Sequence, residues 1–282
     1  MQTPDKKTIS QFFGDMFSRD SDWEGYLSIW TFPDKKTHWF AGQDINTKAV
    51  DFVTGIEGNR DVYFGVGLRG LELGESHRGL EEDVTLLFGL WLDLDIADPV
   101  HKKADNLPPT LEAAQSLLDE MPLKPSYVIH SGHGLQVYWL FKEPLEVEGE
   151  DGLKQARELT IGWQAILKER ALRKNWVVDS VHDLARVMRV PGTFNCKDPS
   201  NIKQVKIIGR NPSLSPKSRV ARYDIADFEP YLLEIETSPT VSVDDIILSA
   251  HAAPPFNKFE ALRSIEPKFG LSWDRNRKDF AD

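Results

Sequence analysis

Leu86-Leu-Phe-Gly-Leu-Trp-Leu-Asp-Leu-Asp-Ile96 is the part of the sequence that decides the fold. A short apolar run predicts a buried β-strand, and the alternating Asp93 and Asp95 predict that its C-terminal end reaches solvent. Side chains two residues apart on a strand lie on one face. Two carboxylates this close repel each other unless a cation lies between them, and hard ions such as Mg²⁺ take oxygen ligands of this kind. The alternative is a strand edge with two solvated aspartates.

Length and composition describe a globular protein with a hydrophobic core. The 282 residues, of which 40% are hydrophobic and 28% charged, are enough for one large domain or two small ones. The sequence contains no apolar run of the roughly 18 residues that a membrane helix needs, so no membrane partner is expected. The N-terminus lacks the apolar stretch of a signal peptide, which predicts a cytoplasmic location. A single cysteine, Cys196, excludes an intrachain disulfide and a Cys-rich zinc site, and we expect no zinc.

The charge is distributed unevenly along the chain. The net charge is −10, which argues against nucleic acid as a partner, yet residues 153–222 contain 15 Lys and Arg against 5 Asp and Glu. A basic stretch of this kind is typical of phosphate binding. A solvated helix face with scattered lysines is the simpler alternative.

Hydrophobic periodicity and turn residues predict alternating helices and strands. A linker is expected over 234–256, around a short helix at 243–250, and a further helix is expected to begin within 273–282. The predicted domains are therefore 1–233 and 234–282, with the second a linker and helical tail that could begin another module. The predicted helices are 8–19, 46–56, 110–121 and 152–173, and the predicted strands are 26–32, 37–40, 61–68, 86–96, two within 126–141, and 203–208.

Gly65, Gly67 and Gly70 match the G-x-G-x-x-G pattern of dinucleotide-binding folds. That pattern requires a helix directly after it. Residues 71–80 contain two more glycines and no amphipathic period, so they predict a loop instead. We therefore do not expect a dinucleotide site here.

Two further segments concentrate polar groups. Ser131-Gly-His-Gly134 lies between two predicted strands and could present backbone N–H groups to a phosphate, although an ordinary hairpin turn explains it equally well. Asp179 follows the apolar residues 176–178, as at another strand end. Arg186 and Arg189 are three residues apart, which would place them on one face of a helical turn. A donor-rich turn follows at 191–197, where Cys196 is expected to be a small filler.

These elements occur in an order that resembles the archaeo-eukaryotic primase superfamily, and most closely the primase-polymerase domains of plasmid, phage and mobile-element replication proteins. The motifs are Asp-x-Asp at 93–95, Ser-Gly-x-Gly-Leu-Gln-x-Tyr-Trp at 131–139, and an Asp at 179 followed by Arg-x-x-Arg-Val-Pro-Gly-Thr-x-Asn-x-Lys at 186–197. The resemblance covers about residues 25–230. It implies an α+β fold, in which an N-terminal αβ module packs on an RRM-like antiparallel or mixed sheet with the active site in the cleft between them.

The resemblance also implies roles for individual residues. Asp93, Asp95 and Asp179 would be the catalytic, metal-binding carboxylates for two Mg²⁺ or Mn²⁺ ions, with Asp183 as the alternative third ligand. Many members carry His where this chain has Gln136, and Gln brings no positive charge; whether His133 replaces that function is left open. The implied nucleotide-binding residues are Ser131, Gly132, His133, Gln136, Arg186, Arg189, Thr193, Asn195 and Lys197.

The function that the resemblance implies is a DNA primase-polymerase, a nucleotidyltransferase that makes primers and extends DNA in the replication of a plasmid, phage or other mobile element. Its partners would be a single-stranded DNA template, a primer and dNTPs or NTPs, with a helicase or other replication module in a longer protein. Two alternatives stay open, a catalytically weak replication-initiation module that binds DNA and a two-metal nuclease.

Overall fold

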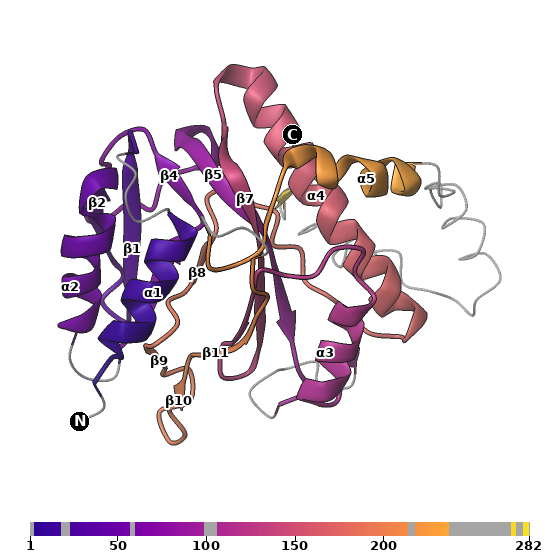
Figure 1. Cartoon of the computed structure of the whole chain (residues 1–282), viewed down its shortest axis with the longest axis horizontal. Coiled ribbons are helices and arrows are strands. Elements are labelled where there is room, and N and C mark those ends of the chain that lie inside the picture. Colours follow the sequence, from indigo (N-terminus) through magenta and orange to yellow (C-terminus); the bar gives the residue numbers. More distant parts are fainter. Residues whose placement is uncertain are drawn as a thin grey trace. The chain divides into compact units, whose positions relative to one another are not determined.

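The predicted strand around Asp93 and Asp95 is β5 (Val84–Asp95), and it lies inside a ten-stranded sheet. The computed structural model describes residues 3–17, 23–56, 60–98, 106–213, 218–236, 272–274 and 279–281. In these residues helices and a large, mostly antiparallel sheet combine, which confirms the predicted α+β class (Figure 1). The helices are α1 (Lys6–Met16), α2 (Val50–Thr54), α3 (Leu111–Asp119), α4 (Gly149–Arg173) and α5 (Glu229–Glu236).

One sheet carries both halves of the predicted site. Its strand order is β11-β6-β7-β5-β4-β1-β3-β8, with β2 paired to β1 and β12 paired to β7. The β12–β7 pair is parallel and the other pairs are antiparallel, so the sheet is mixed. The remaining strands are β1 (Tyr26–Phe32), β2 (Lys36–Ala41), β3 (Asp61–Gly65), β4 (Gly67–Arg69), β6 (Tyr127–His130), β7 (Gly134–Glu146), β8 (Val187–Arg189), β9 (Phe194–Asn195), β10 (Lys203–Gln204), β11 (Lys206–Arg210) and β12 (Arg222–Tyr223).

Helix α1 packs its aromatic face against the sheet. Asp5 caps it by accepting hydrogen bonds from the backbone N–H groups of Lys7 and Thr8. Phe12 is fully buried and meets Tyr138 of β7 at 5.7 Å between ring centroids. It also meets Phe64 of β3 at 5.4 Å. Helix α1 thus joins strands from both halves of the sheet.

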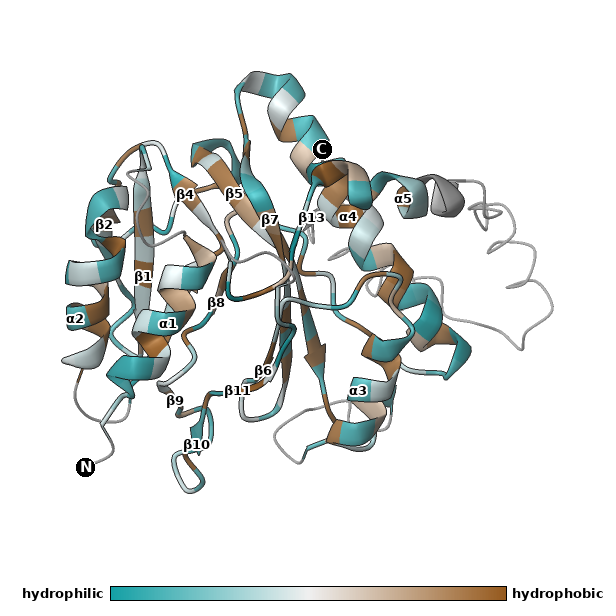
Figure 2. Cartoon of the chain, viewed as in Figure 1, coloured by the Kyte–Doolittle hydropathy of each residue, from teal (hydrophilic) through white to brown (hydrophobic). Residues whose placement is uncertain are grey.

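Helix α4 covers the opposite face of β5 and β7. Trp163 on α4 is fully buried and contacts Trp139 of β7 edge-on, with ring centroids 5.2 Å apart. Hydrophobic segments are visible on β5 and on α4, whose other turns are hydrophilic (Figure 2). Alternate residues of β5 and β7 therefore face two different environments. Leu90 and Trp139 face α4, whereas Asp93 lies on the same face as Tyr138, which packs against α1.

Two N-terminal elements differ from the sequence-based expectations. The helix expected over 46–56 begins as a π-helical stretch, Ile45–Ala49, and only Val50–Thr54 is α-helical. The strand expected over 61–68 is interrupted at Val66, whose backbone N–H donates to the carbonyl of Arg186. After this break β4 leaves β3 and pairs with β5. The glycine-rich segment that follows contains only a short 3-10 turn, Glu81–Asp83, so the dinucleotide pattern has no helix.

The chain divides into two compact units, Met1–Ile235 and Glu236–Asp282. The linker expected over 234–256 and its helix at 243–250 lie almost entirely outside the described residues. The helix expected to begin within 273–282 is wrong. Ser272–Asp274 (β13) and Asp279–Ala281 (β14) pair as antiparallel strands, with Trp273 opposite Phe280. None of the helices in the described residues is long and apolar enough to cross a membrane.

Candidate active site

Asp93 and Asp95 lie on β5 where it pairs with β7. In this register Asp93 is opposite Gln136 and Asp95 is opposite Gly134. The three polar side chains therefore share one face of the sheet. The amide Oε1 of Gln136 is buried and has no hydrogen-bond partner, while its Nε2 lies 3.9 Å from the sulfur of Met188. An unsatisfied buried oxygen next to two carboxylates is an acceptor-rich environment that favours a bound donor or cation.

The electrostatics of Asp93 reflect this crowding. Burial raises the pKa of its carboxyl to about 6, with the negative charge of Asp95 as the second cause. Arg186 and Arg189 act in the opposite direction, and Asp179 raises the pKa further. The Arg186 guanidinium is the nearest cation described, with Nη2 3.8 Å from Oδ2 of Asp93. Without a cation, the protein therefore disfavours the ionised form of Asp93.

Asp179 does not end a strand, because residues 176–186 have no regular structure before β8 begins. Polar contacts hold this segment against β5 in place of strand pairing. The indole Nε1 of Trp91 donates to the carbonyl of Val181 at 2.7 Å. The side-chain amide of Gln164 accepts from the Val181 N–H at 3.1 Å and donates to the Trp91 carbonyl at 3.3 Å. These contacts bring the exposed Asp179 close enough for its charge to raise the pKa of Asp93.

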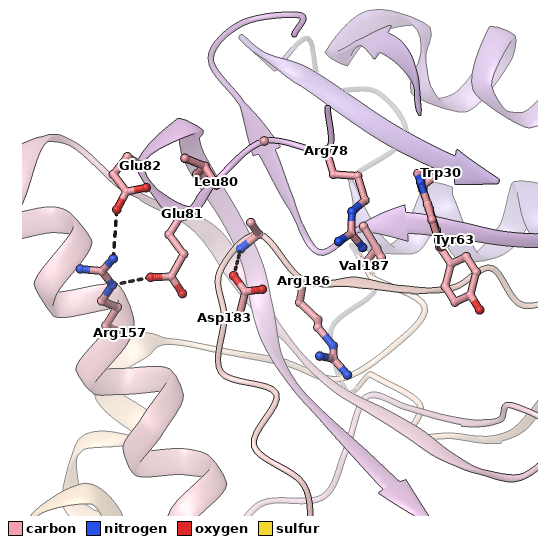
Figure 3. A pocket seen from close by; sticks show the side chains of 12 residues that line it. Trp30, Tyr63, Arg78, Leu80, Glu81, Glu82, Arg157, Asp183, Arg186 and Val187 are labelled. Carbon is pink, nitrogen blue, oxygen red and sulfur yellow. Dashed lines mark hydrogen bonds and ion pairs between the residues drawn. The ribbon is translucent and has the colours of Figure 1, made fainter. Parts of the chain in front are cut away.

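Asp183, the alternative third ligand, has different surroundings. Its carboxylate accepts a 2.9 Å hydrogen bond from the N–H of Ala185 and helps line an open pocket of about 520 Å³ (Figure 3). Its charge acts on the buried Arg69. Burial lowers the pKa of Arg69 to about 10, and the negative charge of Asp183 partly opposes this effect. The charge of Asp179 is among those that raise the pKa of Asp93, whereas that of Asp183 acts on Arg69.

The carboxylates have the donor chemistry of a metal site, but they are not gathered around one point. Among the described residues, no three His, Cys, Asp or Glu side chains lie close enough together to hold an ion as they stand. The donor chemistry nevertheless fits a hard divalent cation. Asp93, Asp95 and Asp179 offer only oxygen ligands, and the raised pKa of Asp93 is the mark of negative charge that a cation would offset.

The turn from Ser131 to Gly134 connects β6 to β7 beside the carboxylates. The Nδ2 of Asn195 donates to the carbonyl of Ser131 at 2.6 Å and so ties this turn to the 191–197 segment. Gly132 has a φ of +105°, a conformation that favours glycine, and a Cβ there would lie 3.1 Å from the Asn195 side chain. This close packing brings two sequence motifs, 60 residues apart, into contact.

A cluster of charged groups surrounds His133. Its Nδ1 lies 3.1 Å from Asp98, and the ammonium of Lys203 lies 2.9 Å from Asp98 and 3.2 Å from His133 Nδ1. Burial lowers the pKa of His133, and the positive charges of Lys203 and Lys197 lower it further against the opposing effect of Asp98. Lys203 was missed by the sequence analysis because it lies outside the motifs, on a two-residue strand.

The two arginines do not lie on a helical turn, as the spacing had suggested. Val187–Arg189 is strand β8, paired with β3, because Met188 and Val190 are buried in the core. Arg189 is 9% exposed, forms an ion pair with Asp61 and lies over the ring of Tyr63 at 4.7 Å. Arg186 precedes the strand, and its guanidinium lies 3.8 Å from the carboxylate of Asp93. Of the two, Arg186 has the more available charge.

The 191–197 segment contains two residues that hold the backbone and one that is accessible. Thr193 is buried and donates to the Val190 carbonyl at 2.7 Å. Asn195 is also buried and accepts from the Lys197 N–H at 3.1 Å. Lys197 itself is exposed, and its charge acts on His133. The predicted residues thus separate into an accessible cation and buried residues that position it.

Comparisons with known proteins found similarity in structure only. No family model and no curated protein sequence matches this chain. The AEP domain of the cyanophage S-2L primase-polymerase is 14% identical, with a TM-score of 0.49, and the match covers 82% of this chain and 100% of that one. Primase RepB′ is 13% identical, with a TM-score of 0.43 and coverage of 93% and 76%. The catalytic domain of RepB′ in complex with initiator DNA is 13% identical, with a TM-score of 0.42 and coverage of 83% and 100%.

These solved proteins are primases, and the TM-score of each against this chain is below 0.5.

Proposed function

We propose that this chain is a DNA primase-polymerase that joins nucleotides on a single-stranded DNA template with Mg²⁺ or Mn²⁺, in the replication of a plasmid, phage or other mobile element. The observation that carries the proposal is that Asp93 and Asp95 share one face of the sheet and that the charge of Asp179 also acts on Asp93. Burial is the main cause of the raised pKa of Asp93, and the charges of Asp95 and Asp179 raise it further. Arg186 adds a cation at the same place.

The carboxylates would hold the metal ions. Asp93 and Asp95 are fixed by the β5–β7 register, and Asp179 is held near them through Val181, Trp91 and Gln164. When bound, two divalent ions supply the charge that stabilises the attacking and leaving oxygens in nucleotidyl transfer. The ionised form of Asp93 would then be favoured, because the cations would offset both the burial and the negative charge of Asp95 that raise its pKa in the free protein.

The cations of the site would bind the triphosphate. Lys197 and Lys203 lie around His133, next to the turn from Ser131 to Gly134, and Arg186 lies beside Asp93. Charge-assisted donors of this kind can offset the negative charge of a triphosphate. Gln136 has a free amide oxygen on the same face and could accept from a hydroxyl or amine of the nucleotide.

The direct test is synthesis by the purified chain on a primed DNA template, with dNTPs or NTPs and either metal. Asp93→Ala should lose synthesis by at least about a thousandfold while it still binds single-stranded DNA, since a ligand of the reacting centre is removed but the binding surface is kept. Asp51→Ala is the matched control, because Asp51 is exposed and its carboxylate pairs with Lys6 at 2.7 Å. Full synthesis by Asp93→Ala would refute the assignment of the carboxylates.

The same assay separates the two alternatives. A two-metal nuclease would cut DNA without added nucleotides and would leave the cations around His133 without a role. A catalytically weak initiation module would bind DNA tightly but incorporate no nucleotide with Mg²⁺ or Mn²⁺. Reactions without a primer then show whether synthesis begins de novo.

A further inference from the structure

One face of the N-terminal strands carries exposed aromatic side chains. Leu27 and Ile29 of β1 are fully buried in the core, so Trp30 and Phe32 lie largely on the other side. Trp30 pairs with Tyr63 of β3, and Tyr63 pairs with Arg189 of β8. This face therefore leads from β1 across β3 to β8, the strand that follows Arg186.

The aromatic side chains on this face form a continuous row. The ring centroids of Phe32 and Trp30 lie 6.1 Å apart, and those of Trp30 and Tyr63 lie 5.2 Å apart. Phe32 is 41% exposed and the other two are partly exposed. We call Phe32, Trp30 and Tyr63 the aromatic row. Its inner end is close to the candidate active site, because the charge of Asp93 acts on Tyr63.

Arginines accompany the aromatic row. The Arg78 guanidinium lies 5.0 Å above the Trp30 ring, and that of Arg189 lies 4.7 Å above Tyr63. Trp30, Tyr63, Arg78 and Arg186 line the same open pocket of about 520 Å³, and Figure 3 shows their side chains around it. Arg78 is exposed and could reach a phosphate while its plane stays against the indole.

The basic stretch 153–222 does not offer an equivalent surface. Several of its cations are paired within the protein and are therefore less available to template phosphates. Arg157 bonds to Glu81 and Glu82, and Lys174 bonds to Glu120. Arg189 bonds to Asp61. A strand that approaches Asp93 therefore needs contacts other than phosphate contacts alone.

We propose that the aromatic row stacks the bases of single-stranded DNA and leads the template to the active site, with Arg78 against the DNA backbone. Rings in a row suit successive bases of a strand, whereas a free nucleotide needs only one ring, and stacking on aromatic side chains tolerates any base sequence. That the bound strand is a template rests on the proposed function, whereas the stacking of single-stranded DNA on the aromatic row does not.

The test is the affinity of the full chain for a fluorescent oligo(dT), measured in EDTA at several salt concentrations. Trp30→Ala should bind about 5- to 150-fold more weakly, the range expected for the loss of one stacked base, with an unchanged salt dependence. Trp30→Phe should bind within about twofold of wild type, since it keeps an aromatic face. Arg78→Ala should instead reduce the slope of log K against log salt by about one.

The matched control is Trp176→Ala, because Trp176 is a partly exposed tryptophan beneath a cation, Lys174, outside the aromatic row. It should leave affinity for oligo(dT) unchanged. If Trp30→Ala binds as tightly as this control, the proposal is wrong. Photo-cross-linking of wild-type protein to oligonucleotides with 5-iodouracil gives an answer that is independent of mutant folding. Cross-links should map to Trp30 or Tyr63, and cross-links only elsewhere would overturn the proposal.

Two arms distinguish the occupant and the function. Excess dTTP should not displace the oligonucleotide from Trp30, and displacement in EDTA would assign the row to the free nucleotide instead. Trp30-dependent binding without any synthesis would refute the polymerase activity but support the stacking row. If Trp30→Ala binds oligo(dT) as wild type does and synthesis is normal, the polymerase activity is supported and the stacking row is refuted.

Discussion

The indole N–H of Trp91 donates a 2.7 Å hydrogen bond to the carbonyl of Val181 across 90 residues of sequence. Trp91 lies two residues before Asp93 on the same face of β5, and Val181 lies two residues after Asp179. This contact therefore ties the irregular segment that carries Asp179 to the strand that carries Asp93. Gln164, which bonds to both backbones, fixes the contact from α4.

We expect Gln164→Leu to lower synthesis by weakening the hold on Asp179. Leucine has a similar volume to glutamine, but it leaves the Val181 N–H and the Trp91 carbonyl without a hydrogen-bond partner on α4. We expect this loss to lower the free energy of unfolding by about 1–3 kcal/mol. The affinity for Mn²⁺, measured by calorimetry, should fall more than the affinity for oligo(dT). Gln155→Leu on the exposed side of the same helix is the control. Equal loss of Mn²⁺ and DNA affinity would indicate general unfolding instead.

Asp93→Asn should stabilise the metal-free protein at neutral pH. The pKa of Asp93 is raised from 3.8 to about 6, so the folded state favours the protonated form. In wild type, the contribution of the Asp93 carboxyl to the free energy of unfolding falls as the pH rises from about 4 to 6, and the loss is complete above that range. The side chain is 26% exposed, and two pKa units correspond to at most about 2–3 kcal/mol.

Urea denaturation in EDTA at pH 7.5 and at pH 4 measures this effect. The variant should have the higher free energy of unfolding at pH 7.5, and the difference should shrink toward pH 4. Saturating Mn²⁺ should reverse the order, because only wild type gains binding energy from the full set of ligands. A variant that is less stable than wild type in EDTA at pH 7.5 would contradict the burial effect.

The third carboxylate is identified by comparing Asp179→Ala with Asp183→Ala. The first should lose synthesis by about a hundredfold or more, since it removes a proposed metal ligand. The second removes the hydrogen bond to the Ala185 N–H and a charge that acts on Arg69, and should lose less than about tenfold. Rates at saturating Mn²⁺ and dNTP measure both. The opposite order would assign the ligand to Asp183.

Lys203→Ala should raise the KM for dNTP by about tenfold or more, because it removes a charge-assisted donor beside His133. Affinity for oligo(dT) should change little, because the aromatic row is untouched. Lys206→Ala is the matched control, since Lys206 is an exposed lysine on the adjacent strand β11. An unchanged KM for Lys203→Ala would remove this cluster from the triphosphate site.

The sequence predicted those parts of the site that depend on local pattern. Asp93 and Asp95 could be placed because strand alternation alone puts them on one face. The turn from Ser131 to Gly134 could be placed because glycines separate two apolar runs. The position of Asp179 could not be derived in this way, since its segment is held by the side chains of Trp91 and Gln164.

Other parts of the site depend on contacts that no local pattern encodes. Arg186 and Arg189 were expected on a helical turn, but pairing of β8 with β3 overrides that spacing. Lys203 has no local motif at all, and only the packing of β10 beside the Ser131 turn gives it a place next to His133. The aromatic row is visible only once the register between β1 and β3 is known.

Strand β4 has only three residues, yet it pairs with β1 on one side and β5 on the other. The aromatic row and the carboxylates therefore belong to one hydrogen-bonded sheet. To move the aromatic row away from the carboxylates, the protein would have to break the backbone hydrogen bonds that β4 makes with β1 and β5. We therefore expect the spacing between the aromatic row and the carboxylates to stay nearly constant when DNA binds.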